Sequence, residues 1–314
     1  MPLIKVTSPS FSQNLALQTE IRRLFADVVL NEGGARMAGA DLIHFLGDAD
    51  GAVIGLEKID VALLEACPRL RIVAKYGVGL DNIDLDACAA RGVTVGWTGG
   101  VNRRSVAELV LCLMLGISRN VFRTSALLRA GHWEKNGGTQ LSGKTIGIVG
   151  LGHIGREVAQ LLAPLGCRIL ANDILPMDAY CREHGIEAVD KEVLFRDADF
   201  VTLHVPVTPL TLGLISEHIL GVMKPTAVLI NTARGEVVDQ PALKRALRSG
   251  RIAGAALDVF DHEPPDDLEF LSLPNLVATA HIGGNALEAV LAMGRSAIGH
   301  LATYFQATSG TVTA

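Results

Sequence analysis

The chain has 314 residues, of which 49% are hydrophobic, so it is long enough to bury a large core and form about two domains. Its 28 lysines and arginines against 33 aspartates and glutamates give a net charge of -5, and the absence of basic clusters argues against a nucleic-acid-binding surface. The longest apolar run, residues 109–117, is too short to cross a bilayer, and the N-terminus lacks a signal-peptide pattern. The 5 cysteines lack the spacing of metal ligands. We therefore expect a cytoplasmic protein that binds no metal, membrane or nucleic acid.

Strand-like runs alternate with helical patterns through about the first 100 residues. The expected strands are Leu3–Val6, Val28–Leu30, Ala52–Ile54, Arg71–Ala74 and Val93–Val95. Helical spacing lies between them, for example over residues 62–66 and 85–90, and a long apolar helix follows over about 104–118. This alternation predicts a parallel sheet with crossover helices.

A second and stronger alternation occupies the rest of the chain. Its expected strands are Thr145–Val149, Arg168–Ala171, Phe200–Leu203, Ala227–Ile230, Ala255–Leu257 and Leu276–Ala278. A helical pattern over about residues 286–305 closes the chain, and its periodicity does not decide which unit it packs on. The fold class is therefore α/β, with two doubly wound parallel-sheet domains and no solenoid or propeller repeat.

The most specific local motif is a glycine-rich turn. Residues 145–155 read Thr-Ile-Gly-Ile-Val-Gly-Leu-Gly-His-Ile-Gly, so that Gly150, Gly152 and Gly155 form G-x-G-x-x-G between a strand and a helix. The motif alone also occurs in ordinary glycine-rich turns. Here the strand–turn–helix context indicates a pyrophosphate cradle, because the glycines permit close backbone approach and the helix N-terminus offers unpaired N–H groups.

An acidic residue follows the next strand, about 20 residues further on. Asp173 can accept hydrogen bonds from an adenosine ribose, and it would repel the 2′-phosphate of NADP. No lysine or arginine occurs over residues 172–181. The sequence thus predicts NAD as the cofactor.

Three chemically useful side chains follow strands of the second unit. Arg234, Glu263 and His281 come after the expected strands over residues 227–230, 255–257 and 276–278. Each alone is more typical of a surface arginine, a solvated carboxylate or a histidine bonded to backbone groups. Because the carboxyl ends of parallel strands meet at one edge, we expect all three beside the dinucleotide turn.

Together these groups suit the reduction of a 2-keto acid. A guanidinium grips a carboxylate at two points, and an imidazolium delivers a proton to the carbonyl oxygen as hydride reaches carbon. A carboxylate beside the imidazole fixes its tautomer and favours its protonated form.

The residues resemble the D-isomer-specific 2-hydroxyacid dehydrogenase family, most closely its phosphoglycerate-dehydrogenase-like branch. The stretches that carry the resemblance are residues 75–81, 101–108, the glycine turn, 203–206, 231–239, 257–264 and 281–284. The resemblance implies a Rossmann NAD-binding domain over residues 101–285. It also implies that this domain is inserted in a flavodoxin-like substrate domain made of residues 1–100 and 286–314, and that the chain forms a homodimer built largely on the NAD domains.

The resemblance also implies a function for individual residues. Arg234, His281 and Glu263 would be catalytic, and the turn Gly77, Val78 and Gly79, with Asn102 and Lys75, would bind substrate. Asp258 would bind the nicotinamide carboxamide. The expected cofactor-binding set is Gly150, Gly152, His153, Ile154, Gly155, Asp173, His204, Val205, Pro206, Thr232, Ala233, Asp258 and Gly283.

The substrate is the part of the prediction that stays open. Relatives that oxidise phosphoglycerate have an arginine shortly after the third strand, where this chain has Gly55-Leu-Glu57, and Lys75 replaces a second arginine. A D-2-hydroxyacid or its keto acid is expected, with 3-phosphoglycerate, glyoxylate, hydroxypyruvate and phosphonopyruvate as alternatives. Lys75 and Lys135 are candidates for gripping a second anionic group of the substrate. A non-enzymatic alternative is an NAD-sensing, corepressor-like binding protein, although the extended tails of such proteins are missing.

Overall fold

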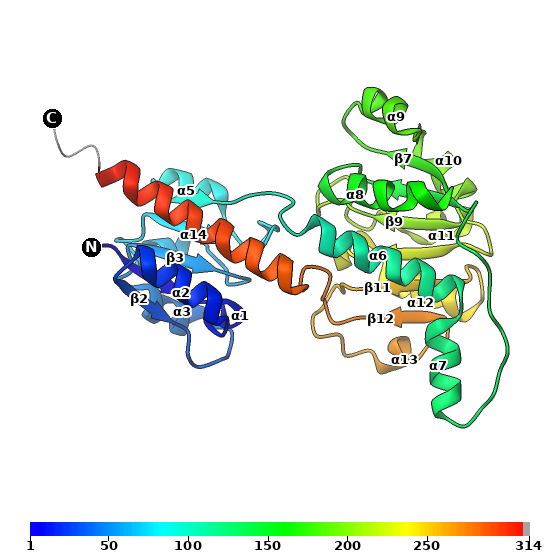
Figure 1. Cartoon of the computed structure of the whole chain (residues 1–314), viewed down its shortest axis with the longest axis horizontal. Helices are drawn as coiled ribbons and strands as arrows, with labels where there is room; N and C mark the ends of the chain where they lie inside the picture. Colours follow the sequence, from blue (N-terminus) through cyan, green and yellow to red (C-terminus); the bar gives the residue numbers. More distant parts are fainter. Residues whose placement is uncertain (310–314) are drawn as a thin grey trace. The chain divides into compact units, whose positions relative to one another are not determined.

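The computed structural model describes residues 1–309, which divide into two compact units. One contains Met1–Asn102 and the described residues from Gly284 onward, and the other contains Arg103–Gly283 (Figure 1). The terminal helix belongs to the first unit, which answers the question that periodicity left open.

The first unit is built on a five-stranded parallel sheet of order β2-β1-β3-β4-β5. Its strands are β1 Leu3–Val6, β2 Asp27–Leu30, β3 Gly51–Ile54, β4 Ile72–Lys75 and β5 Thr94–Gly96. Its helices are α1 Pro9–Ser12, α2 Leu15–Leu24, α3 Gly39–Leu46, α4 Val61–Ala66, α5 Leu85–Ala90 and α14 Leu287–Ser309. Every residue of β3 and β4 is buried, as expected for central strands with helices on both faces.

Two hydrophobic cores sandwich this sheet. One joins β1, β3 and β4 to α1, α2 and α14 through residues such as Phe11, Leu17 and Leu301. The other joins the opposite face to α3, α4 and α5. Side chains of Asn14, Asp60 and Asp84 accept hydrogen bonds from the first turns of α2, α4 and α5, which explains where these helices begin.

The second unit contains a seven-stranded parallel sheet of order β12-β11-β10-β9-β6-β7-β8. Its strands are β6 Thr145–Val149, β7 Arg168–Asn172, β8 Glu187–Ala188, β9 Phe200–Leu203, β10 Val228–Asn231, β11 Gly254–Leu257 and β12 Leu276–Ala278. Its α-helices are α6 Arg103–Ser118, α7 Val121–Arg129, α8 His153–Leu162, α9 Asp178–His184, α10 Lys191–Asp197, α11 Glu217–Val222, α12 Gln240–Arg248 and α13 Leu268–Leu271. The short 3₁₀ helices η1 Ala163–Leu165 and η2 Gly235–Val237 complete it.

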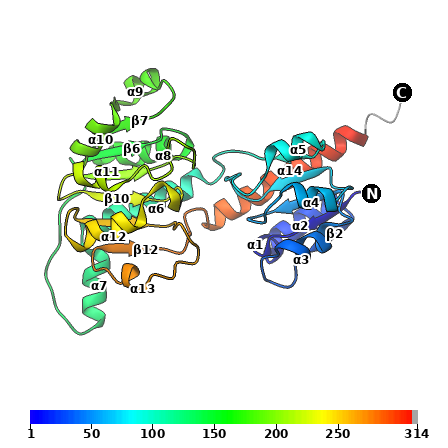
Figure 2. The same cartoon turned by 180° about the vertical axis from the view of Figure 1, so that it is seen from behind.

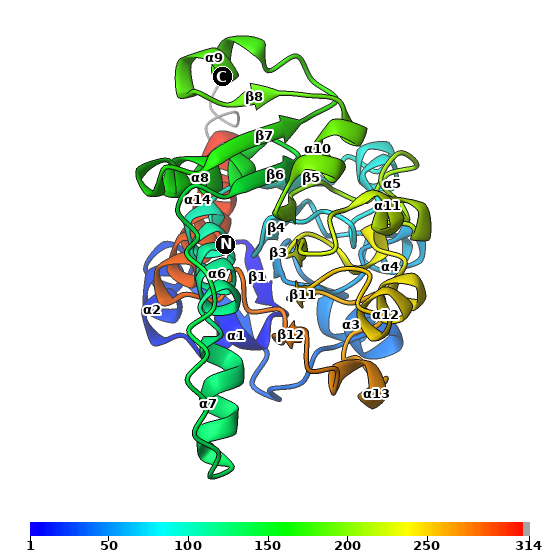
Figure 3. The ribbon, with the colours of Figure 1, turned by 90° about the vertical axis from the view of Figure 1, so that its right-hand side faces the viewer.

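Helices cover both faces of this sheet as well. Helices α6 and α8 pack on one face, and α10, α11 and α12 pack on the other (Figure 2). Helix α7 has no buried residue and extends away from the sheet of its own unit (Figure 3). The predicted α/β class with two parallel sheets is confirmed, and β8 is an edge strand of two exposed residues that the sequence pattern did not reveal.

No single helix in the described range is long and apolar enough to span a membrane, although α6 and α7 pass by length and composition as a pair bent by 64°. Within residues 1–309, no group of three or more histidine, cysteine, aspartate or glutamate side chains is placed to hold a metal ion.

Candidate functional site

The strand order of the second unit reverses between β6 and β9. From β6 the chain adds β7 and β8 on one side, and β9 to β12 then extend the sheet on the other. In doubly wound sheets, ligands bind outside the carboxyl ends of the strands at this reversal. The glycine turn leaves β6 there and His204 leaves β9 there.

The glycine turn is packed so closely that two of its glycines admit no side chain. A Cβ on Gly150, whose φ is +92°, would lie 2.4 Å from the carbonyl oxygen of His204. A Cβ on Gly155 would lie 2.1 Å from the carbonyl oxygen of Gly150. Gly152 instead faces open space and is the N-cap of α8 without a side-chain cap. His153 and Ile154 begin α8, so their N–H groups lie at the uncapped helix end, as a pyrophosphate requires.

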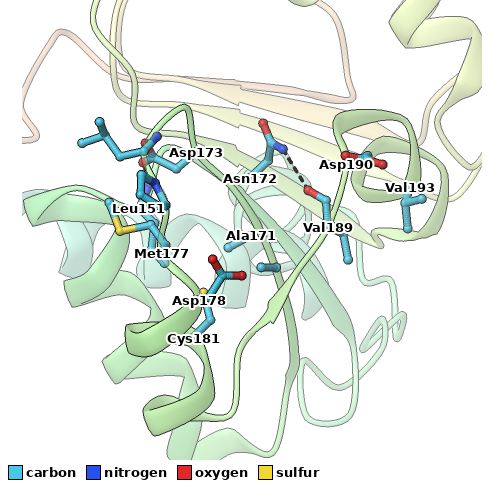
Figure 4. A pocket seen from close by; sticks show the side chains of 13 residues that line it. Leu151, Ala171, Asn172, Asp173, Met177, Asp178, Cys181, Val189, Asp190 and Val193 are labelled. Atoms are coloured by element: carbon cyan, nitrogen blue, oxygen red, sulfur yellow. Dashed lines mark hydrogen bonds between the residues drawn. The ribbon is translucent and has the colours of Figure 1, made fainter.

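Asp173 holds the glycine turn in place. Its Oδ2 accepts a hydrogen bond from Leu151 N at 2.7 Å, and its Oδ1 accepts one from Leu175 N at 2.9 Å. A cavity of about 510 Å³ adjoins it, and Figure 4 shows Asp173 and Leu151 at one end and Asp190 and Val193 at the other. The carboxylate therefore stands at the edge of a hollow beside the expected pyrophosphate cradle.

Buried polar atoms without protein partners occur at the ends of β9 and β10. Nδ1 of His204 and Oγ1 of Thr232 are both shielded from solvent and make no hydrogen bond. Burial lowers the pKa of His204 to about 3, so the ring is neutral at physiological pH, and its Nε2 lies 3.0 Å from Thr202 Oγ1. Unsatisfied buried polar groups are costly. These two atoms, the open face at Gly152 and the uncapped α8 together fit a dinucleotide.

Arg234 lies on a loop that two neighbouring residues fix. The buried Asn231 closes the loop, because its Nδ2 donates to Arg234 O at 2.7 Å and its Oδ1 accepts from Ala233 N at 3.0 Å. A Cβ on Gly235 would lie 1.9 Å from the carbonyl carbon of Phe260. The half-buried Arg234 is thus held beside the loop that carries Glu263.

Glu263 and His281 form a hydrogen-bonded pair. His281 Nδ1 lies 2.8 Å from Glu263 Oε2, while Glu263 Oε1 accepts a hydrogen bond from Phe260 N at 3.1 Å. Nδ1 is occupied by the carboxylate, so Nε2 is the ring nitrogen that can exchange a proton with a substrate. Phe260 lies between the two loops, because its N–H donates to Glu263 and its backbone leaves no room for a side chain at Gly235, the residue after Arg234.

Asp258 organises the loop that carries His281. This carboxylate is 1% exposed and accepts hydrogen bonds from Thr279 Oγ1 at 2.6 Å and from Ile282 N and Gly283 N at 2.8 Å each. His281 has a φ of 52°, in the left-handed region that non-glycine residues rarely adopt. The Asp258 network encloses this strained residue on both sides. The sequence indicated only a cofactor contact for Asp258 and not this second function, because the hydrogen-bond partners are mostly backbone N–H groups.

Within the first unit, the turn Gly77–Val78–Gly79 follows the carboxyl end of β4. Gly77 has a φ of +141°, which favours glycine. None of the three N–H groups donates to a protein acceptor within the described residues. The turn therefore presents free donors, as a carboxylate-binding site needs.

Lys75 and Asn102 are both buried, but their polar atoms differ. Lys75 is 3% exposed, and its Nζ donates to Gly55 O at 2.5 Å and to Asn82 Oδ1 at 2.6 Å. These bonds do not favour the predicted contact of Lys75 with substrate. Asn102 is 7% exposed and its Oδ1 has no partner, so it keeps an acceptor for a ligand. Lys135 is exposed.

Comparison with known proteins identifies the family. The family model described as "D-isomer specific 2-hydroxyacid dehydrogenase, NAD binding domain" matches residues 111–283, which lie within the second unit. The chain belongs to this family. Its NAD-binding domain gives NAD as the cofactor of this dehydrogenase-family member.

Individual relatives of this family member cover most of its length. It is 42% identical over 242 residues to a glyoxylate reductase of Thermococcus litoralis, covering 74% of this chain and 73% of that protein. It is 41% identical over 251 residues to a D-3-phosphoglycerate dehydrogenase of Mycobacterium leprae, covering 79% of this chain but only 48% of that protein. The chain thus spans about half the length of the mycobacterial relative. A solved 2-hydroxyacid dehydrogenase of Ketogulonicigenium vulgare has a TM-score of 0.83 and 31% identity, covering 98% of this chain and 96% of that one.

Proposed function

We propose that the chain is an NAD-dependent dehydrogenase that interconverts a D-2-hydroxyacid and its 2-keto acid. The observation that carries this proposal is the His281–Glu263 pair, at 2.8 Å, on the same unit and sheet edge as the dinucleotide turn. The free thiols of all 5 cysteines support the cytoplasmic location that we also propose.

Each side chain has a defined task in this reaction. Bound NAD(H) supplies or accepts the hydride. The Arg234 guanidinium grips the substrate carboxylate, and in the reducing direction His281 Nε2 gives a proton to the carbonyl oxygen. Glu263 orients the ring through its contact with Nδ1, and Asp258 fixes the loop that carries the ring.

For the substrate, we propose a small acid without a phosphate group, such as glyoxylate or hydroxypyruvate. Leu56, which is 57% exposed, and Glu57, a carboxylate only 2% exposed, follow β3. Glu57 Oε2 accepts a hydrogen bond from Gly55 N at 2.6 Å, and Lys75 Nζ is bonded to Gly55 O. An apolar side chain, a buried acid and an engaged lysine disfavour a phosphate at this position. Because the mycobacterial relative is a D-3-phosphoglycerate dehydrogenase, 3-phosphoglycerate is the second candidate substrate.

A substrate screen tests both proposals. NADH oxidation would be followed with glyoxylate, pyruvate, hydroxypyruvate, phosphohydroxypyruvate and phosphonopyruvate. We expect the highest kcat/KM with an unphosphorylated acid. A preference for phosphohydroxypyruvate would contradict the substrate proposal alone. If none of the five acids were reduced faster than the background rate while NADH bound tightly, the proposed enzymatic function would be contradicted and an NAD sensor favoured.

Cofactor preference gives a separate prediction at Asp173. NADH should show a higher kcat/KM than NADPH, because the carboxylate repels a 2′-phosphate. Asp173→Ala should reduce the difference in kcat/KM between NADH and NADPH, mainly by weakening the binding of NADH. Asp178→Ala is the control, because Asp178 lines the same cavity on α9 without holding the glycine turn. Equal use of NADPH by the native protein would contradict the assignment.

We also propose that the chain forms a homodimer through α7 and the segment that follows it. Helix α7 has no buried residue in the single chain, and large apolar side chains stand exposed there, with Val121 52%, Leu128 56% and Trp133 79% exposed. Apolar surface of this extent indicates a partner, and a second copy of this chain is the partner that the family resemblance implies.

Sedimentation tests the dimer. The native protein should sediment at about twice the chain mass of 33.2 kDa. The double variant Leu128→Asp with Trp133→Ser should sediment as a monomer. Leu15→Asp is the control, because Leu15 is 76% exposed on α2 of the other unit. A native monomer, or a double variant that stays dimeric, would refute this interface.

A further inference from the structure

Trp97 is the first residue after β5, and its indole contacts the turn that follows β4. Trp97 Nε1 donates a hydrogen bond to Val78 O at 2.8 Å. The strands β4 and β5 are paired in parallel, so the two segments leave the sheet side by side. Although 41% exposed, the tryptophan is thus fixed at its polar atom.

The backbone on both sides of Trp97 is anchored to α14. A Cβ on Gly96 would lie 2.5 Å from His300 Cβ, so β5 ends directly against that helix. Thr98 Oγ1 lies 2.8 Å from His300 Nε2 and accepts a hydrogen bond from Ser296 Oγ at 2.9 Å. The indole therefore projects from a segment that has little freedom to move.

The turn that it contacts has more freedom. Gly79 supplies one of the two torsions about which the Val78–Gly79 peptide rotates, and glycine tolerates many values of φ. On its other side, Gly77 packs against the stem of Lys75, where an added Cβ would lie 3.2 Å from Cε. The hydrogen bond from Trp97 is then the contact that fixes the orientation of this peptide.

That orientation decides where the Gly79 N–H points. In a trans peptide the C=O and N–H directions are opposite. With the Val78 carbonyl held toward Trp97, the Gly79 N–H points away from the indole, and no protein acceptor receives it within residues 1–309. We propose that Trp97 is a positioning residue that aims the Gly79 N–H at the substrate carboxylate. This inference rests on the proposed function.

The test compares variants of the full-length protein with the best keto acid of the screen and with oxalate as an inhibitor. Trp97→Phe removes the N–H but keeps an aromatic ring. It should raise KM for the keto acid and Ki for oxalate together by about 3- to 10-fold, the effect of one neutral hydrogen bond. The KM for NADH and the pH profile should stay the same, because neither the cofactor nor His281 is touched.

Two further variants separate positioning from stability. Trp97→His restores an aromatic N–H donor and should recover part of the lost affinity. Thr98→Val removes the neighbouring bonds to His300 and Ser296, so it should lower the melting temperature without raising Ki for oxalate. Equal Ki values for Trp97→Phe and native protein, or an equal rise in Thr98→Val, would overturn the proposal.

A measurement that keeps Trp97 covers the case in which Trp97→Phe does not fold. The chain has 2 tryptophans, so Trp133→Phe leaves Trp97 as the only indole. Oxalate binding in the presence of NAD should shift its fluorescence emission, and an unchanged emission at saturation would overturn the proposal. If native protein neither reduces keto acids nor binds oxalate, the proposed function itself fails. If the native protein is active but the Trp97 variants keep native KM and Ki values, only the proposed positioning by Trp97 is refuted.

Discussion

Replacing His281 with alanine should lower kcat for keto-acid reduction at least about 100-fold, within the usual range for losing a general acid. The ring nitrogen Nε2 is the proton donor in our mechanism, because Glu263 Oε2 occupies Nδ1 at 2.8 Å. Binding of NADH should change little, since the glycine turn and Asp173 lie after β6 and β7. Steady-state kinetics with NADH titration would measure both quantities.

A matched control lies in the loop of Glu263. His262 is exposed, and His262→Ala removes an imidazole from the same region without touching the pair. It should keep native kcat. If both alanine variants lost activity equally, or if His281→Ala stayed active, His281 would not be the acid.

The partner of His281 should affect catalysis because it positions the ring. Glu263→Gln keeps the size of the side chain, but its amide can present either an oxygen or an NH2 group to Nδ1, so the ring is held less firmly than by the carboxylate at 2.8 Å. We expect a lower kcat for keto-acid reduction and for hydroxyacid oxidation, while KM for NADH stays near its native value. Steady-state kinetics in both directions would measure this, and a native kcat in Glu263→Gln would show that Glu263 does not position the ring.

Sequence patterns were sufficient to predict the strands that read as apolar runs and the functional residues that directly follow them. The buried strands β9, β10 and β11 read as apolar runs, and the residues after each one marked the carboxyl edge on which Arg234 and Glu263 lie. The edge strand β8 has two exposed residues, too short for any period to appear. The apolar spacing of α14 suits either unit, so only its packing against the first sheet assigns it there.

In the candidate site, too, the sequence motifs predicted some residues, while others became visible only through the contacts that folding creates. The motifs indicated the charged candidates, because a charged residue soon after an apolar strand is easily recognised in the sequence. They did not reveal Asn231 and Asp258 as supports of the loops, since their partners are backbone groups brought together by folding. They also suggested Lys75 as a free cation. Its ammonium instead donates hydrogen bonds to Gly55 and Asn82, which lie 20 and 7 residues away along the chain.

Replacing Arg234 with lysine should lower kcat/KM for the keto acid by at least about 10- to 100-fold. Loss of a charge-assisted hydrogen bond at a desolvated site costs about 1.5–3 kcal/mol, which corresponds to that range. Lysine keeps the positive charge, but an ammonium is a point charge without the planar fork that grips a carboxylate at two points. The loop itself should survive, because Asn231 bonds the backbone of residues 233 and 234 rather than the guanidinium.

The loss should appear mainly in KM for the keto acid, while KM for NADH stays near its native value. Arg248→Lys is the control, since this arginine on α12 forms an exposed ion pair with Glu269, and such pairs contribute little. Oxalate inhibition adds an independent measure, because its Ki should rise in Arg234→Lys by about the same factor as KM. A variant with native kinetics, or one that weakens NADH as much as the keto acid, would show that Arg234 does not hold the substrate carboxylate. The Gly77–Gly79 turn would then be the remaining candidate for that contact.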